Sequence, residues 1–161
     1  MTVLVTHLRM EDPAQLRPAA TFPGLTLREV RDPAVNATLY AEVGGPYAWH
    51  DRRGWTREEW AGYALAPTTR TLLGTLGEET VGYGELVRLP EGDVELRLFG
   101  LRPSFVGQGL GGALLTLVTW EAWQWGARRV VLSTCTLDHP RALPAYLARG
   151  FTALRTEAHA H

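Results

Sequence analysis

The chain has 161 residues, of which 45% are hydrophobic and 20% are charged, a balance typical of a globular protein with one core rather than of a disordered chain. The formal net charge of −1 excludes a strong field that would favour nucleic acid or an acidic membrane surface as a partner. The single cysteine, Cys135, excludes an internal disulfide framework and a cysteine-based zinc cluster, and the histidines show no metal-ligand spacing.

The N-terminal part of the chain predicts two strands and a helix. Residues 1–24 form an N-terminal extension, in which residues 2–8 alternate loosely and could add a strand before three prolines interrupt regular structure. Residues 25–30 alternate apolar and polar side chains, which is typical of a strand. Residues 34–43 have helical spacing and end at two glycines and a proline.

The middle of the chain predicts a short helix followed by an antiparallel meander. Thr56 and Glu59 form a capping box, which marks the start of the helix. Residues 69–76, 80–89 and 94–101 have the composition of three strands. The turns between them are short and therefore require antiparallel hairpins, because a parallel crossover needs many more residues.

The C-terminal part predicts a long helix over 109–125, a buried strand over 128–134, a helix within 140–149 and a last strand over 151–155. Pro144 removes one backbone donor, so the second helix either begins near residue 143 or is kinked in its first turn. The long helix carries three tryptophans, which we expect to pack or to form a homodimer surface: Trp120, Trp123 and Trp125. The layout predicts an α/β fold of the mixed α+β kind, with a mainly antiparallel central sheet flanked by helices.

A glycine-rich turn lies between the third strand of the meander and the long helix. Four glycines, at 107, 109, 111 and 112, leave the backbone N–H groups open to an anion, and the helix N-terminus adds unpaired donors and a partial positive charge. The segment matches Gly-x-Gly-x-x-Gly, but the dinucleotide motif needs a parallel βαβ unit and an acidic residue after the next strand. Neither is present, so the turn predicts a phosphate site of another kind; a plain strand-to-helix turn is the alternative.

Two segments resemble motifs of the GNAT acetyltransferases. Residues 106–111 resemble the family's acetyl-CoA-binding motif Arg/Gln-x-x-Gly-x-Gly/Ala, and residues 139–142 with 146–151 resemble its Asn-x-x-Ala…Tyr-x-x-x-Gly-Phe element. The two segments are separated by one helix and one strand, as they are in the family. Val106 stands where the family usually has Arg or Gln, and His139 stands where it often has an Asn that contacts the pantetheine arm.

The resemblance implies an N-acetyltransferase that uses acetyl-CoA as co-substrate and acetylates a primary amine by direct attack in a ternary complex. The weak net charge favours a small-molecule amine over a protein N-terminus, which stays the alternative acceptor. The lack of a signal pattern and of a long apolar run predicts a soluble cytoplasmic protein, with a single domain over residues 1–161. A strand bulge would splay two strands and open a site for acyl-CoA, and an acyl-CoA-binding sensor without turnover is the alternative function. Tyr146 matches the tyrosine that protonates the leaving thiolate, or else it only packs its helix. The implied cofactor-binding residues are Phe99, Gly100, Leu101, Val106, Gly107, Gln108, Gly109, Leu110, Gly111, Gly112 and His139.

The catalytic base and the acceptor site are less defined by the sequence. Glu85 and Glu95 lie on strands near the expected acceptor side and are candidate bases, together with Asp51 or a chain of water molecules. Each carboxylate could equally be solvated or ion-paired. Residues 47–52, Tyr-Ala-Trp-His-Asp-Arg, form a segment that we call the aromatic loop. In this loop we expect Trp49 to stack on the acceptor, Asp51 to hold an amine and Arg52 to hold a carboxylate. The alternative for this loop is a small satellite core with a surface ion pair.

Overall fold

The computed structural model describes residues 2–47 and 49–160, and Ala48 of the aromatic loop lies outside them. A seven-stranded sheet in the order β2-β3-β4-β5-β6-β1-β7 forms its centre. The strands are β1 (Thr2–Met10), β2 (Leu25–Val30), β3 (Thr69–Leu76), β4 (Glu79–Arg88), β5 (Val94–Leu101), β6 (Val130–Cys135) and β7 (Thr152–Ala160). All neighbouring strands are antiparallel except β5 and β6, which are parallel.

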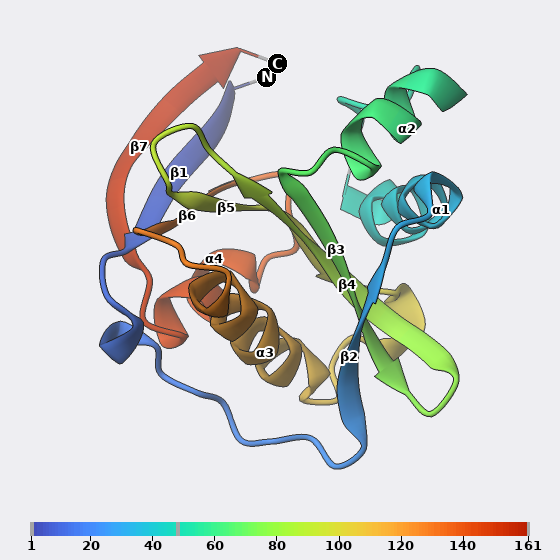
Figure 1. Ribbon diagram of the computed structural model, residues 1–161. Coiled ribbons are helices and arrows are strands. Elements are labelled where there is room, and N and C mark those ends of the chain that lie inside the picture. The colour runs from blue at the N-terminus through green and yellow to red at the C-terminus, as the bar shows by residue number, and fades with distance from the viewer. Residues whose placement is uncertain (1, 48, 161) are drawn as a thin grey trace.

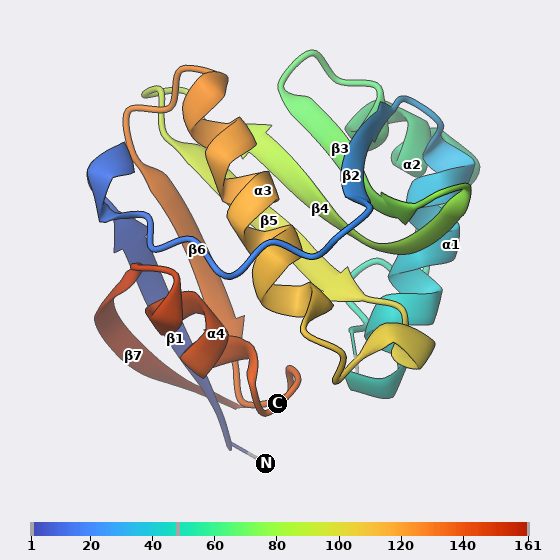
Figure 2. The same ribbon diagram turned by 90° about the horizontal axis from the view of Figure 1, so that it is seen from below.

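Helices cover both faces of this sheet. They are α1 (Pro33–Gly44), α2 (Arg57–Ala64), α3 (Leu110–Gln124) and α4 (Ala142–Ala148). Figure 1 and Figure 2 show α3 and α4 on one face and α1 and α2 on the other. The fold class predicted from the sequence is therefore confirmed. None of the helices in the described part of the chain combines the length and the apolar character needed to cross a bilayer.

The local signals in the sequence account for most of the element boundaries. The capping box predicted at the start of α2 is present, with Thr56 Oγ1 accepting from Glu59 N and Glu59 Oε1 accepting from Thr56 N. Pro144 lies in the first turn of α4, where its missing N–H costs no intrahelical bond, so no kink is needed. Residues 152–160 form the last strand, which is longer than the sequence pattern indicated.

The N-terminal strand is an internal strand of the sheet rather than an appendage. β1 lies between β6 and β7 and pairs with both in antiparallel register (Figure 1). The chain after β1 crosses the end of α4, where Arg17 N donates to Arg149 O at 2.9 Å. A Cβ on Gly150 would lie 2.0 Å from Gln15 O, and Gly150 has φ +102°. This contact explains physically why the residue before Phe151 must be glycine.

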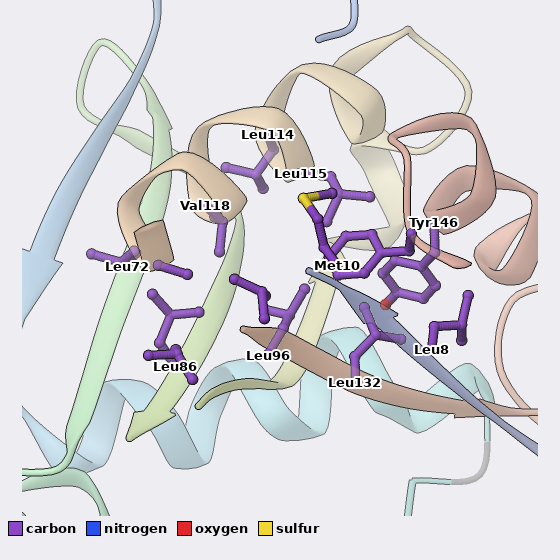
Figure 3. Close-up of a cluster of buried hydrophobic side chains, with 14 residues drawn as sticks. Leu8, Met10, Leu72, Leu86, Leu96, Leu114, Leu115, Val118, Leu132 and Tyr146 are labelled. Carbon is purple, nitrogen blue, oxygen red and sulfur yellow. The ribbon is translucent and has the colours of Figure 1, made fainter. Parts of the chain in front are cut away.

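Helix α3 packs the main core against the sheet. Leu114, Leu115 and Val118 of this helix face buried side chains of the strands (Figure 3). The strand residues are Leu8, Met10, Leu72, Leu86, Leu96 and Leu132. A second cluster under α1 contains Leu39, Val43, Leu73 and Tyr83. The long helix has two half-buried tryptophans at its C-terminal end, Trp123 and Trp125, whereas Trp120 is 47% exposed.

Strands β5 and β6 separate soon after they begin. They pair only at Val94–Val130 and Glu95–Val131, although β5 continues to Leu101 and β6 to Cys135. The register between β4 and β5 shifts where Leu98 pairs with Glu85 and Leu96 with Leu86. Arg97 is therefore an extra residue in β5, and such a bulge bends the strand and increases its twist. The bulge and the splayed pair that the resemblance implied are both present.

Candidate active site

A cavity of about 930 Å³ opens where β5 and β6 diverge. Its wall is formed by β5, the glycine-rich turn, α4, the β6–α4 loop and the aromatic loop between α1 and α2. The cavity is lined by most of the residues that the sequence indicated: Trp49, Asp51, Arg52, Phe99, Gly100, Leu101, Val106, Gly107, Gly109, Gly111, Gly112, His139 and Tyr146. Gln108, Leu110, Glu85 and Glu95 do not line it.

The glycine-rich turn presents backbone rather than side chains to the cavity. Gly107 and Gly109 have φ +87° and +83°, which L residues rarely adopt, and a Cβ at either position would meet no atom within 4 Å. Gly109 is the N-cap of α3, and no side chain caps this helix end. The first N–H groups of α3 therefore keep their hydrogen-bonding capacity, and the positive end of the helix dipole is at the cavity. This arrangement suits a phosphate group.

The two predicted residues of this turn outside the cavity have structural roles. Gln108 is exposed, and its Nε2 donates to Ser104 O at 3.1 Å, which closes the turn before α3. Leu110 is fully buried in the core. Neither side chain lines the cavity, whereas the backbone N–H groups of both residues remain part of the turn, and binding of the cofactor by them remains a prediction.

The splayed edge of β5 supplies the wall opposite the turn. Phe99, Gly100 and Leu101 lie beyond the last pairing of β5 with β6, so their backbone groups on that side have no ladder partner in β6. The sequence suggested that Gly100 lets the backbone approach a ligand. In the structure, a Cβ on Gly100 would lie 2.4 Å from Cγ1 of Val43, so the close packing of α1 on β5 requires this glycine.

Tyr146 projects from α4 into the cavity wall between Phe99 and Phe151. The ring centroids are 6.4 Å and 6.1 Å away, and both pairs are edge-to-face. Figure 3 shows the Tyr146 ring directed from α4 toward the sheet. Burial raises the pKa of the Tyr146 hydroxyl above its ordinary value, and the nearby Asp138 carboxylate adds to this effect. The hydroxyl is therefore protonated at neutral pH, the state that a general acid requires.

Asp138 is a site residue that the sequence reasoning missed. Its Oδ2 accepts from Thr134 Oγ1 and from Cys135 N, and its Oδ1 accepts from Trp49 Nε1 at 3.1 Å. Asp138 therefore joins the β6–α4 loop to the aromatic loop across the cavity. The available signal was an Asp at the turn directly after a buried strand, since Asp favours such turns by bonding to nearby backbone. The partner Trp49 could not be identified from spacing.

His139 has a local role beside Asp138. Its Nδ1 accepts from Arg141 N at 3.0 Å, which holds the turn before α4. Its ring lies edge-on to Tyr47 with centroids 5.3 Å apart. The side chain also lines the cavity. The helix-start role considered for His139 is therefore present, and contact with a pantetheine arm remains a prediction.

Arg52 lies in a cage of aromatic rings. Its guanidinium carbon is 4.3 Å from the ring centroid of Tyr63 and 4.8 Å from that of Trp55. Tyr40 and Trp60 follow at 5.6 Å and 5.7 Å. The residue is only 7% exposed. The loop thus contains a buried cation–aromatic cluster instead of the surface ion pair considered from the sequence.

Glu85 compensates the charge of Arg52. The Glu85 carboxylate is fully buried and accepts from Arg52 Nη1 at 2.9 Å, Tyr63 Oη at 2.6 Å and Asn36 Nδ2 at 2.8 Å. Burial alone would lower the pKa of Arg52, but Glu85 and Tyr63 outweigh it and raise the pKa, so Arg52 is charged. Burial and the Glu85 charge also raise the pKa of Tyr63. With three donors and no cavity surface, Glu85 is poorly placed to accept a proton from an acceptor.

The remaining candidate carboxylates differ in their surroundings. Glu95 does not line the cavity, and Arg97 Nε donates to its Oε1 at 2.9 Å. Asp51 is exposed and lines the cavity, and within residues 2–47 and 49–160 its carboxylate has no hydrogen-bond or ion-pair partner. Of the three carboxylates that the sequence suggested as bases, Asp51 is thus the one with unpaired oxygens at the cavity.

Comparisons with known proteins agree with this geometry. The model of the Acetyltransferase (GNAT) family matches residues 36–151. Over 91 residues the chain is 35% identical to an uncharacterized N-acetyltransferase of Mycobacterium tuberculosis (strain H37Rv) and to one of Mycobacterium bovis. The match spans 56% of this chain and 58% of the length of those relatives.

Solved structures with similar folds have low sequence identity. A GCN5-related N-acetyltransferase from Kribbella flavida superposes with a TM-score of 0.69 at 21% identity, covering 96% of this chain and 56% of that one. An aminoglycoside acetyltransferase from an uncultured soil metagenomic sample superposes with a TM-score of 0.63 at 14% identity, covering 78% of this chain and 87% of that one. At these identities the likeness shows the fold alone.

Proposed function

The chain belongs to the GNAT acetyltransferase family, and from this premise we propose that it transfers an acetyl group from acetyl-CoA to the primary amine of a small molecule. One observation carries the proposal. A single cavity joins an uncapped helix N-terminus, a splayed strand edge, a protonated tyrosine and an aromatic loop. These are the groups needed for a phosphate-bearing acyl donor, its thioester, the leaving thiolate and an acceptor.

In the proposed assignment, the donor is held mainly by backbone. The N–H groups of the glycine-rich turn and the first turn of α3 bind the pyrophosphate, and the unpaired edge of β5 from Phe99 to Leu101 runs beside the pantetheine arm. Backbone contacts do not depend on side chains. The replacement of the family's usual Arg or Gln by Val106 is therefore compatible with binding.

The chemistry proceeds by direct attack in a ternary complex. The neutral amine nitrogen attacks the thioester carbonyl carbon, a C–N bond forms and the C–S bond breaks. The nitrogen loses one proton to a base or to water, and the thiolate takes one proton from the Tyr146 hydroxyl, which solvent then reprotonates. The products are the N-acetyl amine and CoA thiol. Asp51 is the carboxylate available for the first proton transfer, since Glu85 and Glu95 are engaged by Arg52 and Arg97.

Titration calorimetry with acetyl-CoA tests the donor site, and α3 offers a matched pair of variants. Gly109 and Gly126 lie at opposite ends of this helix with φ +83° and +88°, and a Cβ at either would meet no atom within 4 Å. Alanine therefore adds the same backbone strain at both positions, but only Gly109 lines the cavity. We expect Gly109→Ala to weaken acetyl-CoA binding about tenfold, a loss of about 1.4 kcal/mol, and Gly126→Ala to leave it unchanged.

Release of free CoA thiol in the presence of an amine panel tests turnover. Acetyl-CoA binding with thiol release that requires an amine supports the enzyme. Binding without release from any amine would instead favour an acyl-CoA sensor. If neither acetyl-CoA nor a longer acyl-CoA binds, or if NAD binds in their place, the proposed function is wrong.

A further inference from the structure

The acceptor end of the cavity has unbalanced negative charge. The glycine-rich turn and Tyr146 occupy the donor end, so the acceptor is left with the aromatic loop and the end of β6. Asp51 and Asp138 both line this region, and both act on the thiol of Cys135, whose pKa is raised first by burial and then by these charges. Two carboxylates therefore line the same end of the cavity.

The arginines that line the cavity balance at most part of this charge. Arg52 is buried, bonded to Glu85 and stacked among four aromatic rings. Arg97 is paired with Glu95, with Nε to Oε1 at 2.9 Å. Arg141 is the N-cap of α4 and lines the cavity, and within the described residues its side chain has no ion-pair partner. Two of the three arginines that line the cavity are thus neutralised by carboxylates of the protein itself, and Arg141 alone faces Asp51 and Asp138.

Aromatic surface accompanies the carboxylates. Trp49 lies against α1 closely enough that a Cβ on Gly44 would be 2.2 Å from its ring, and its indole is fixed by the bond to Asp138. Tyr47 and Tyr63 also line the cavity. Rings next to an unpaired carboxylate favour a cationic group on an apolar body, because the ring faces and the carboxylate attract the same charge.

Resting on the proposed function, we infer that the acceptor is a cationic amine that carries no carboxylate, and that Asp51 sets this preference. The Asp51 carboxylate attracts the ammonium group as it enters between the rings of the aromatic loop. An α-amino acid would bring its own carboxylate toward Asp51 and Asp138, two carboxylates against the single unpaired arginine of the lining, Arg141. The assignment reverses the sequence-based expectation that Arg52 holds a carboxylate of the acceptor.

Matched acceptors test the inference. Initial rates of acetyl transfer from acetyl-CoA are measured with phenethylamine against phenylalanine, histamine against histidine, and phenylalaninamide against phenylalanine. The last pair has the same bulk and differs in the carboxylate charge. We expect kcat/KM to be at least about tenfold higher for the member without a carboxylate, a preference that corresponds to about 1.4 kcal/mol.

Two variants locate the origin of the preference. Asp51→Asn keeps the shape and removes the charge, and we expect KM for phenethylamine to rise about three- to tenfold while the preference over phenylalanine shrinks by a similar factor. Because Asp51 is also the proposed base, kcat should fall for both members of each pair, and the ratio of their kcat/KM values reports the preference. Glu91→Gln removes one exposed negative charge from the β4–β5 turn, outside the cavity lining. It should leave the preference unchanged, which separates a local effect of Asp51 from a change in net charge.

The outcomes distinguish this inference from the proposed function. Equal or better use of the amino acids by the wild type overturns the inference while acetyl transfer stands. A preference that survives in Asp51→Asn overturns the role of Asp51. Absence of turnover with every pair also overturns the inference, and the acetyl-CoA titration then shows whether the proposed function has failed with it.

Discussion

One end of the cavity is formed by backbone groups and the other by side chains. The end that we propose for the donor consists of backbone: glycines with positive φ, an uncapped helix N-terminus and an unpaired strand edge. The end that we propose for the acceptor consists of side chains: a buried Arg52–Glu85 pair, a cage of rings and the Asp138–Trp49 bond. A backbone site needs only the local conformation of one segment, whereas a side-chain site needs several segments to meet.

The largest expected effect concerns the side-chain end. Glu85→Gln keeps the size of the residue but leaves the buried Arg52 charge without compensation, and removing one partner of a buried pair typically costs about 3–5 kcal/mol. We therefore expect the free energy of unfolding to fall by about that amount in urea denaturation.

Glu95→Gln is the matched control for this variant. Glu95 lies on the adjacent strand and also pairs with an arginine, but its side chain is 25% exposed and Arg97 is 36% exposed. An exposed pair contributes about 0–1 kcal/mol, so the loss should be small. Similar losses for the two variants would show that the Arg52–Glu85 pair does not hold the acceptor end together.

The next largest effect concerns the chemistry at the donor end. Tyr146→Phe removes the hydroxyl that we propose as the acid, and loss of a general acid lowers kcat by roughly a hundredfold or more. Because Tyr146 packs through its ring against Phe99 and Phe151, the phenylalanine should keep this packing and leave the Kd for acetyl-CoA unchanged. Steady-state thiol release and calorimetry measure the two quantities separately. Full kcat in Tyr146→Phe would assign the thiolate proton to water.

The same difference between backbone and side chains decides what the sequence could predict. The meander, the long helix and the glycine-rich turn follow from hydrophobic period, short turns and glycine spacing, which are local signals, and all of them are confirmed. The position of β1 between β6 and β7 could not be predicted, because it depends on pairing with strands that are more than a hundred residues away.

The sequence could not identify side-chain partners across the cavity either. Arg52 and Glu85 are 33 positions apart, and Trp49 and Asp138 are 89 apart. No periodicity links such residues, so Arg52 could be taken from the sequence for a ligand of the substrate and Asp138 could be overlooked. A charged residue among aromatic residues can be buried and paired within the protein, as Arg52 is, as well as bind a substrate.

The smallest expected effect concerns Tyr83, a buried polar group that lacks the hydrogen bonds that Glu85 has. Tyr83 is fully buried beneath α1, and its hydroxyl has no hydrogen-bond partner within the described residues, in contrast to Tyr63, which donates to Glu85. A buried hydroxyl without a partner is destabilising. We expect Tyr83→Phe to leave stability at neutral pH unchanged or to raise it by up to about 1 kcal/mol.

The dependence of stability on pH gives a second test of Tyr83. Burial raises the pKa of Tyr83 well above its ordinary value, followed by the charge of Glu85, so the folded state keeps the hydroxyl protonated while the unfolded chain ionises near pH 10. The unfolded state therefore binds fewer protons above about pH 10, and stability decreases there as pH rises. Tyr63 and Tyr146 have raised pKa values and add to the same decrease.

Urea midpoints measured on both sides of about pH 10 should fall less steeply for Tyr83→Phe than for the wild type. A loss of stability at neutral pH in this variant would instead mean that the hydroxyl has a partner, and that the side-chain end of the cavity is bonded throughout.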